Sequence, residues 1–183
     1  MADYNFDRFS VLLVEDSSFM QTMLINSLKI LSVGTVKTCN DGGEAIEFIQ
    51  RVKSNPMKAG VQSIDIIISN WEMSPVNGMM LLRWVRRHKD SADRFIPFLM
   101  ISGYAEEERV CEARDLGVTE FLSKPFSVDA IAQKMLAVVD RPRQFVHTRD
   151  YFGPDRRRLK MPHEGGERRV FKDDSPEVEV VRG

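Results

Sequence analysis

Apolar residues recur along the first 140 residues in short, continuous runs that are separated by longer segments with helical periodicity. Five runs have the length of a strand: 11–14, 36–39, 64–69, 97–101 and 120–122. Runs of this kind are typical of strands that are covered on both faces. Between them, apolar side chains repeat every three or four residues, which is typical of helices with one buried face. The pattern therefore predicts alternating strands and helices.

Five such strand–helix units imply right-handed crossovers and a parallel sheet with helices on both faces. We expect an α/β, flavodoxin-like (βα)5 doubly wound sheet of strand order 2-1-3-4-5. The first helical stripe includes Met20, Met23 and Leu24, with Asp16–Ser18 as capping candidates. A second helix is expected to end before Asn55. Gly117 is a candidate C-cap, and the basic residues 86–89 fall at the end of another helix.

After Asp140 no period is sustained, and residues 141–183 contain too few apolar side chains for a core of their own. We therefore divide the chain into a body, 1–140, and a mostly irregular C-terminal extension, 141–183. Residues 177–180 alternate Glu and Val. They are expected either to fray or to add a strand to a sheet edge.

The formal net charge of −1 hides an uneven distribution. The body carries a net −4, residues 141–172 carry +6, and residues 173–183 form an acidic tip of −3. No run is long and apolar enough to span a membrane, and the N-terminus does not resemble a secretory signal. Two cysteines are too few for a disulfide framework or a zinc site. We expect a reduced, cytoplasmic protein.

Polar side chains follow the predicted strands where their carboxyl ends meet, which is where doubly wound sheets bind ligands. They are Glu15 and Asp16, Asn70, Ser102 and Lys124. Paired carboxylates suit a hard cation such as Mg²⁺, and a lysine beside a hydroxyl suits a phosphoryl group. The alternative is a simple ion pair between Lys124 and Asp16.

Four stretches resemble response-regulator receiver domains of the CheY type: VLLVEDSSFM (11–20), DIIISNWEMSPVNGMMLL (65–82), FLMISGYAEEE (98–108) and EFLSKPF (120–126). The resemblance implies that Glu15, Asp16 and the backbone carbonyl of Glu72 are Mg²⁺ ligands. It also implies that Ser102 and Phe121 are switch residues. Lys124 corresponds to the lysine that pairs with the phosphate, and the Lys124-Pro125 bond is expected to be cis.

One position departs from that family, because its phospho-accepting aspartate falls on Asn70. Phosphoryl transfer needs a carboxylate nucleophile, which an amide does not supply. Asn70 also removes one of three clustered negative charges, so that Mg²⁺ binding should weaken. We therefore expect a pseudo-receiver that is not an enzyme. Relocated phosphorylation at Ser69 is the weaker alternative.

The basic segment combines arginines, aromatic rings and acids. Arginine pairs with phosphate or with the guanine edge, and a neighbouring carboxylate accepts from guanine N–H groups. The acid-Arg-Arg element at Asp155–Arg157 recurs at Glu167–Arg169. These repeats favour cyclic di-GMP as a ligand, with the following candidate contacts: Arg143, Tyr151, Asp155, Arg156, Arg157, Arg158, Glu167, Arg168 and Arg169.

The stretch RPRQFVHTRDYFGPDRRR (141–158), followed by GGERR, resembles the arginine-rich extensions of CheY-like cyclic-di-GMP effectors. The resemblance implies that the dinucleotide controls binding to a protein partner in motility or surface attachment, such as a motor, a kinase or another effector. Three alternatives stay open: a solvated tail on a ligand-independent adaptor, a phospho-accepting regulator despite Asn70, and RNA binding, which we consider the weakest.

Overall fold

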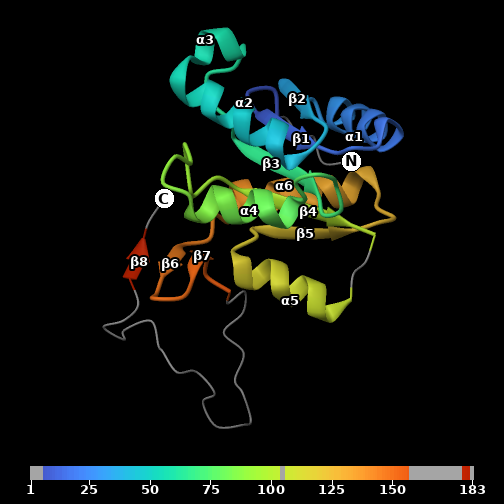
Figure 1. Cartoon of the computed structure of the whole chain (residues 1–183). Coiled ribbons are helices and arrows are strands. Elements are labelled where there is room, and N and C mark those ends of the chain that lie inside the picture. Colours follow the sequence, from blue (N-terminus) through green and yellow to red (C-terminus); the bar gives the residue numbers. More distant parts are fainter. Residues whose placement is uncertain (1–5, 104–105, 157–178, 182–183) are drawn as a thin grey trace.

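The central sheet has the predicted order, β2-β1-β3-β4-β5, with all strands parallel. The computed structural model describes residues 6–103, 106–156 and 179–181. The strands of this sheet (Figure 1) are β1 (Ser10–Val14), β2 (Thr35–Cys39), β3 (Ile66–Asn70), β4 (Phe98–Ser102) and β5 (Glu120–Ser123). The flavodoxin-like prediction is confirmed.

Helices cover both faces of this sheet, because alternate side chains of its strands point to opposite sides. The helices are α1 (Ser18–Ile30), α2 (Gly42–Ser54), α3 (Pro56–Ala59), α4 (Gly78–Arg87), α5 (Glu107–Leu116) and α6 (Val128–Asp140). Leu24 of α1 and Ile131 of α6 share one core with Leu13 of β1. On the other face, Ile49 of α2 and Leu82 of α4 pack in a second core.

The predicted helix ends are confirmed in three places. The hydroxyl of Ser17 caps α1, α2 ends at Ser54, and Gly117 ends α5 with a positive φ of 96°. Two predictions were incomplete. The short helix α3 was not predicted, and Met23 is 43% exposed instead of buried. Leu24 and Leu28 form the buried side of α1, so Met23 lies beyond its edge.

The extension contributes a small antiparallel sheet of order β7-β6-β8 that its sequence pattern did not predict. Its strands are β6 (Phe145–His147), β7 (Phe152–Pro154) and β8 (Glu179–Val181). Of the two possibilities for the acidic tip, the structure therefore shows the edge strand. Figure 1 places β6 and β7 at the end of the molecule from which β5 starts, opposite to its arrowhead.

Aromatic packing attaches this sheet to the body. The rings of Phe145 and Phe152 lie 5.2 and 5.4 Å from the ring of Phe95, which precedes β4. Gly117 allows β7 to come close, since a Cβ there would lie 2.8 Å from the carbonyl oxygen of Phe152. The described strands of the extension thus pack their aromatic rings against the body.

A buried arginine lies beneath this contact. The side chain of Arg86, one of the basic residues predicted at the end of a helix, is completely buried at the end of α4. It donates to the carbonyl oxygens of Gly117, Arg94 and Ile96 at 2.8–2.9 Å and to Oγ1 of Thr119 at 3.2 Å. The signal was present: position 86 lies four residues after the buried Leu82, on the same helix face.

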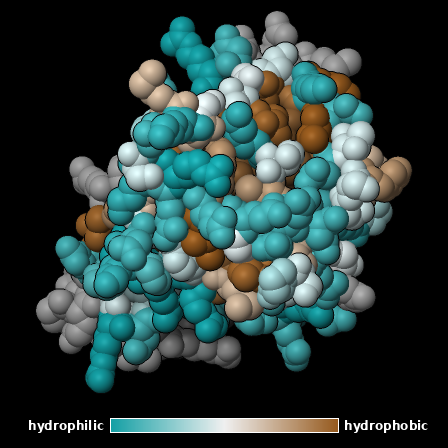
Figure 2. Space-filling model, turned by 45° about the horizontal axis from the view of Figure 1, so that its top comes forward, coloured by the Kyte–Doolittle hydropathy of each residue, from teal (hydrophilic) through white to brown (hydrophobic). Residues whose placement is uncertain are grey.

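Within the described residues, no helix is long and apolar enough to cross a membrane. Figure 2 shows a mostly hydrophilic face on which hydrophobic side chains form limited patches. Large apolar side chains that are more than two-thirds exposed are Phe19, Ile30 and Met57.

Candidate functional site

Strand register brings the predicted crevice residues together. Val14 of β1 pairs with Ser69 of β3, so Glu15 and Asn70 follow side by side. Ser102 pairs with Ser123, which places Lys124 next to the end of β4. The close approach of α4 depends on Gly78, since a Cβ there would lie 2.2 Å from the carbonyl oxygen of Asn70.

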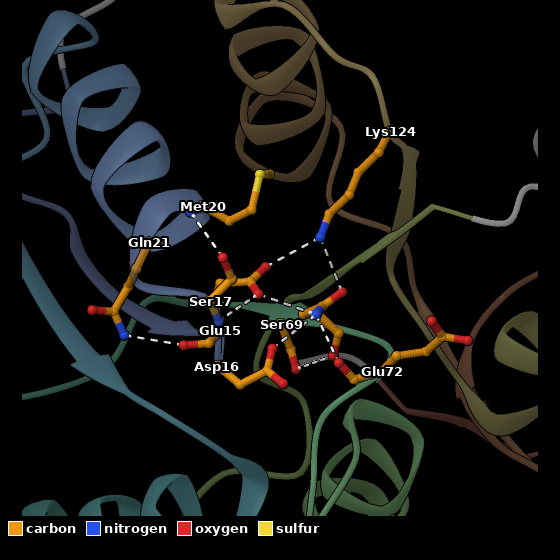
Figure 3. A network of polar contacts seen from close by, with 9 residues as sticks. Glu15, Asp16, Ser17, Met20, Gln21, Ser69, Glu72 and Lys124 are labelled. Atoms are coloured by element: carbon orange, nitrogen blue, oxygen red, sulfur yellow. Dashed lines mark hydrogen bonds and ion pairs between the residues drawn. The ribbon is translucent and has the colours of Figure 1, made fainter.

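Asn70 is the centre of the network. Its amide nitrogen Nδ2 lies 3.2 Å from Oε1 of Glu15, 3.4 Å from Oδ1 of Asp16 and 2.8 Å from the carbonyl oxygen of Glu72. On the other side, Lys124 Nζ donates to Oδ1 of Asn70 at 3.3 Å. Three acceptors around one end of the amide and a cation at the other determine its orientation. Figure 3 shows the side chains of Glu15, Asp16 and Lys124 converging, while Glu72 takes part through its backbone carbonyl and its side chain points away.

Glu15 is the buried acid of this network, with a side chain that is nearly inaccessible to solvent. Burial raises the pKa of its carboxyl group above the usual 4.5, while the amide of Ser17 and the ammonium of Lys124 act in the opposite direction. Lys124 Nζ lies 3.2 Å from Oε2 of Glu15. The ion pair of the crevice therefore joins Lys124 to Glu15, and not to Asp16 as the alternative from the sequence proposed.

The proposed Mg²⁺ ligands do converge, since Glu15, Asp16 and the Glu72 carbonyl all contact one atom. That atom is a nitrogen donor, Nδ2 of Asn70, at the place where a cation would be needed. Turning the amide would point Nδ2 at Lys124 and set two donors against each other. This arrangement does not fit Mg²⁺. Within the described ranges, no three His, Cys, Asp or Glu side chains form a possible metal site.

The predicted switch residues lie on neighbouring strands. Ser102 is buried at the end of β4, and its carbonyl oxygen accepts from the amide of Lys124 at 2.8 Å. The ring of Phe121 contacts Trp71 edge to face, with centroids 6.4 Å apart. Arg109 of α5 lies over the same tryptophan and pairs with Glu72 at 3.0 Å. The Lys124-Pro125 bond is cis, as predicted.

The surroundings of Ser69, the alternative phospho-acceptor, do not suit phosphorylation. Its hydroxyl group is completely buried and donates to the carbonyl oxygen of Asn70 at 2.9 Å. A buried hydroxyl with its proton committed to the backbone has no access to a phosphoryl donor.

Four of the predicted ligand contacts lie within the described part of the extension, and they form intramolecular contacts there. Arg143 donates to the carbonyl oxygens of Thr119 and Asp155, the latter at 3.2 Å. Arg156 lies 4.0 Å over the ring of Tyr151 and pairs with Asp115 of α5 at 3.1 Å. The remaining candidates lie outside the described residues: Arg157, Arg158, Glu167, Arg168 and Arg169.

Residues 11–136 match the response regulator receiver domain family. The chain belongs to this family. It is 26% identical over 131 residues to the chemotaxis protein CheY-3 of Vibrio cholerae. The aligned residues cover 72% of this chain and 92% of that protein. The chain is therefore a CheY-like receiver-domain signalling protein, and the match of the family ends before the extension.

Solved structures agree with this assignment. The structure of CheY4 from Vibrio cholerae is 28% identical, covers 73% of this chain and 97% of its own, and superimposes with a TM-score of 0.54. The receiver domain of the histidine kinase CKI1 from Arabidopsis thaliana, solved with Mg²⁺ and BeF3⁻, has the same fold. It reaches a TM-score of 0.65 at 22% identity and covers 76% of this chain and 95% of its own.

Proposed function

We propose that this chain is a non-enzymatic, cytoplasmic signalling adaptor whose receiver body, 1–140, works without phosphorylation of Asn70. The observation that carries the proposal is the network around the Asn70 amide, which donates to Glu15, Asp16 and the Glu72 carbonyl. An amide nitrogen is not a nucleophile toward phosphorus at neutral pH, because its lone pair is delocalised into the carbonyl group.

The lysine of the crevice supports the same proposal. In a phosphorylated receiver, Lys124 would have to pair with the incoming phosphoryl group, but here it contacts Glu15 and Asn70. Both sides of the crevice are thus already joined, directly by the Lys124–Glu15 ion pair and through the neutral side chain of Asn70. A body held in this way presents a constant surface to its protein partner, and the signal must enter elsewhere.

We further propose that the signal is cyclic di-GMP and that the extension, 141–183, binds it. Support comes from Arg156, whose side chain is 40% exposed and stacks on Tyr151, with Asp155 next to it in the chain. Exposed guanidinium groups beside aromatic rings suit guanine bases and phosphates. The ligand would thereby change how the protein binds a motor, a kinase or another effector.

Beryllofluoride tests the first part of the proposal, because it mimics a phosphoryl group on an aspartate. With Mg²⁺ and beryllofluoride, we expect no change in the NMR signals of Ser102 and Lys124 in the natural chain. The Asn70→Asp variant should show clear changes at both positions. Equal changes in both proteins would overturn the proposal and favour the phospho-accepting alternative.

Calorimetry with cyclic di-GMP tests the second part. Binding should be lost in the double variant Arg156→Ala, Arg157→Ala and retained in Arg149→Ala, which removes an exposed arginine from the same extension. A natural chain that releases no heat at tens of micromolar dinucleotide would contradict it. A pull-down that needs the extension but ignores the dinucleotide would instead favour the ligand-independent adaptor.

A further inference from the structure

A cavity of about 380 Å³ lies where the extension meets the starting ends of β4 and β5. We call it the basal pocket. Residues from the body line it together with residues 141–143 and 145 of the extension. The side chains that matter for its chemistry are Phe95, Glu120, Arg141, Pro142, Arg143 and Phe145. It lies at the opposite end of the sheet from Asn70, so it is separate from the receiver crevice.

The pocket has walls that suit a flat ring. Phe95 and Phe145 meet edge to face at 5.2 Å, and Pro142 adds a further apolar surface. The volume lies at the lower end of the range of small-molecule sites, roughly 300–1,000 Å³. It therefore has room for a single nucleotide unit, and not for a large substrate.

The charged groups of the pocket are arginines contributed by the extension and a glutamate at the start of β5. Arg143 is held in place by its bonds to the carbonyl oxygens of Thr119 and Asp155, and Arg141 is exposed at the rim. Glu120 is buried at the start of β5, where Lys134 holds its Oε2 at 2.8 Å.

These charges distinguish between bases. A carboxylate has about four acceptor positions, so a carboxylate that pairs with lysine can accept further hydrogen bonds. The Watson–Crick edge of guanine offers two adjacent N–H donors to a carboxylate, whereas adenine places a donor beside an acceptor. Two arginines at the rim can then reach a phosphate group.

We propose that the basal pocket binds one guanylate unit of a guanine nucleotide. The base lies against Phe95 and Phe145 with its donor edge toward Glu120, and the phosphate lies at Arg141 and Arg143. This inference rests on the proposed function, because it names the place of cyclic di-GMP. It adds the body residues Phe95 and Glu120 to the site, so that the ligand bridges body and extension.

The adjoining chain supports this location. Arg143, which lines the pocket, donates to the carbonyl oxygen of Asp155, and the amide of Asp155 donates to the carbonyl oxygen of Gln144 at 2.7 Å. The first acid-Arg-Arg element therefore starts directly beside the pocket. Asp155 and Arg156 would there contact the second guanylate of a dinucleotide whose first guanylate occupies the pocket.

Calorimetry with cyclic di-GMP on the full chain tests the pocket through two variants of different kinds. Val138→Trp places a large side chain into the pocket from α6, and Arg141→Ala removes an exposed guanidinium that takes no part in a described hydrogen bond. Each should weaken binding by at least about tenfold, Val138→Trp because the ring fills the pocket and Arg141→Ala because one charged contact is lost. Arg149→Ala is the matched control and should change affinity less than about twofold.

Cyclic di-AMP serves as the base control and should bind at least about tenfold more weakly than cyclic di-GMP. Methyl NMR signals of Ala137 and Val138 should shift when cyclic di-GMP is added. Unchanged binding in both pocket variants, with loss in the Arg156→Ala, Arg157→Ala variant, would overturn the pocket and leave the proposed ligand intact. A natural chain that binds no cyclic di-GMP would overturn both, and equal binding of both dinucleotides would overturn the role of Glu120.

Discussion

Each end of the central sheet buries a charge, and the two charges are satisfied in different ways. At the carboxyl end, Glu15 is met by side chains from other strands, Asn70 and Lys124. At the starting end, Arg86 donates to three backbone carbonyls and one hydroxyl group. Burial lowers the pKa of Arg86 to about 9, which still leaves it charged at neutral pH.

The two ends of the sheet therefore differ in how strongly mutation can change their contacts. Backbone carbonyls do not change with mutation, so three of the four contacts of Arg86 depend only on its own side chain and on the course of the loops that it joins. The crevice is a set of side chains, in which a single replacement changes the chemistry. We infer that the starting end is the structural anchor of the molecule, and that the crevice, with Asn70 at its centre, is the end whose chemistry depends on individual side chains.

The largest effect should come from breaking the anchor. Arg86→Met would leave the carbonyl oxygens of Ile96 and Gly117 without their donor, and we expect the free energy of unfolding to fall by about 3–5 kcal/mol. Urea denaturation measures it. Arg83→Met, on the exposed face of the same helix, is the control and should cost less than about 0.5 kcal/mol. Equal losses of stability in the two variants would contradict the role of Arg86 as the structural anchor of the starting end.

A smaller effect is expected when a carboxylate takes the place of the Asn70 amide in the crevice. Asn70→Asp removes the Nδ2 donor and adds a third acid, so the free energy of unfolding should fall by about 1–3 kcal/mol without Mg²⁺. Mg²⁺ should restore it in the variant and leave the natural chain unchanged. The fluorescence of Trp71, followed in a Trp84→Phe background, reports binding beside the site. A response of the natural chain would show that its amide accommodates the metal.

The raised pKa of Glu15 predicts a dependence on pH. Because its pKa is higher in the folded chain, the folded state binds more protons than the unfolded state as the pH rises above the usual 4.5. The contribution of Glu15 to stability is therefore greatest below pH 4.5 and is lost as the pH rises through the raised pKa. Glu15→Gln should remove this part of the pH profile in thermal unfolding. A variant profile parallel to that of the natural chain would contradict it.

The smallest effect should come from the exposed contact between body and extension. Asp115→Asn removes the ion pair with Arg156, in which both partners are partly exposed, and should cost less than about 1 kcal/mol in the free energy of unfolding. Hydrogen exchange of the β6 and β7 amides should rise only slightly, because Phe145 and Phe152 still hold the sheet. A large rise would place the attachment of the extension in this ion pair and not in the aromatic cluster.

The crevice was predictable because its signals are local. A strand is recognised from its apolar run, and the carboxyl ends of parallel strands meet at one edge, so Glu15, Asn70 and Lys124 could be placed together from the sequence. Which acid pairs with Lys124 was not predictable. That choice depends on how far side chains reach across the sheet from β1 to the end of β5, and it favours Glu15.

The starting end of the sheet was missed because its signals are long-range. Arg86 lies among basic residues at a helix end. Its place four residues after Leu82 indicates the buried helix face, but the distant Phe145 is needed to show what covers it. Strands of three residues, such as β6 and β7, are too short to establish a period of two. Phe95 and Glu120 had no motif that would have marked them as candidates for a pocket.

The sequence by itself predicted the fold class, the helix caps at Ser17 and Gly117, and the place of Asn70 in the crevice, since each can be recognised from the pattern of residues along the chain. The tertiary structure alone decided that the Asn70 amide donates to the acids around it, that Arg86 is buried, and that the extension closes a pocket against the body. These features join residues 24 to 55 positions apart, and such contacts are selected by packing and hydrogen-bond satisfaction and not by local pattern.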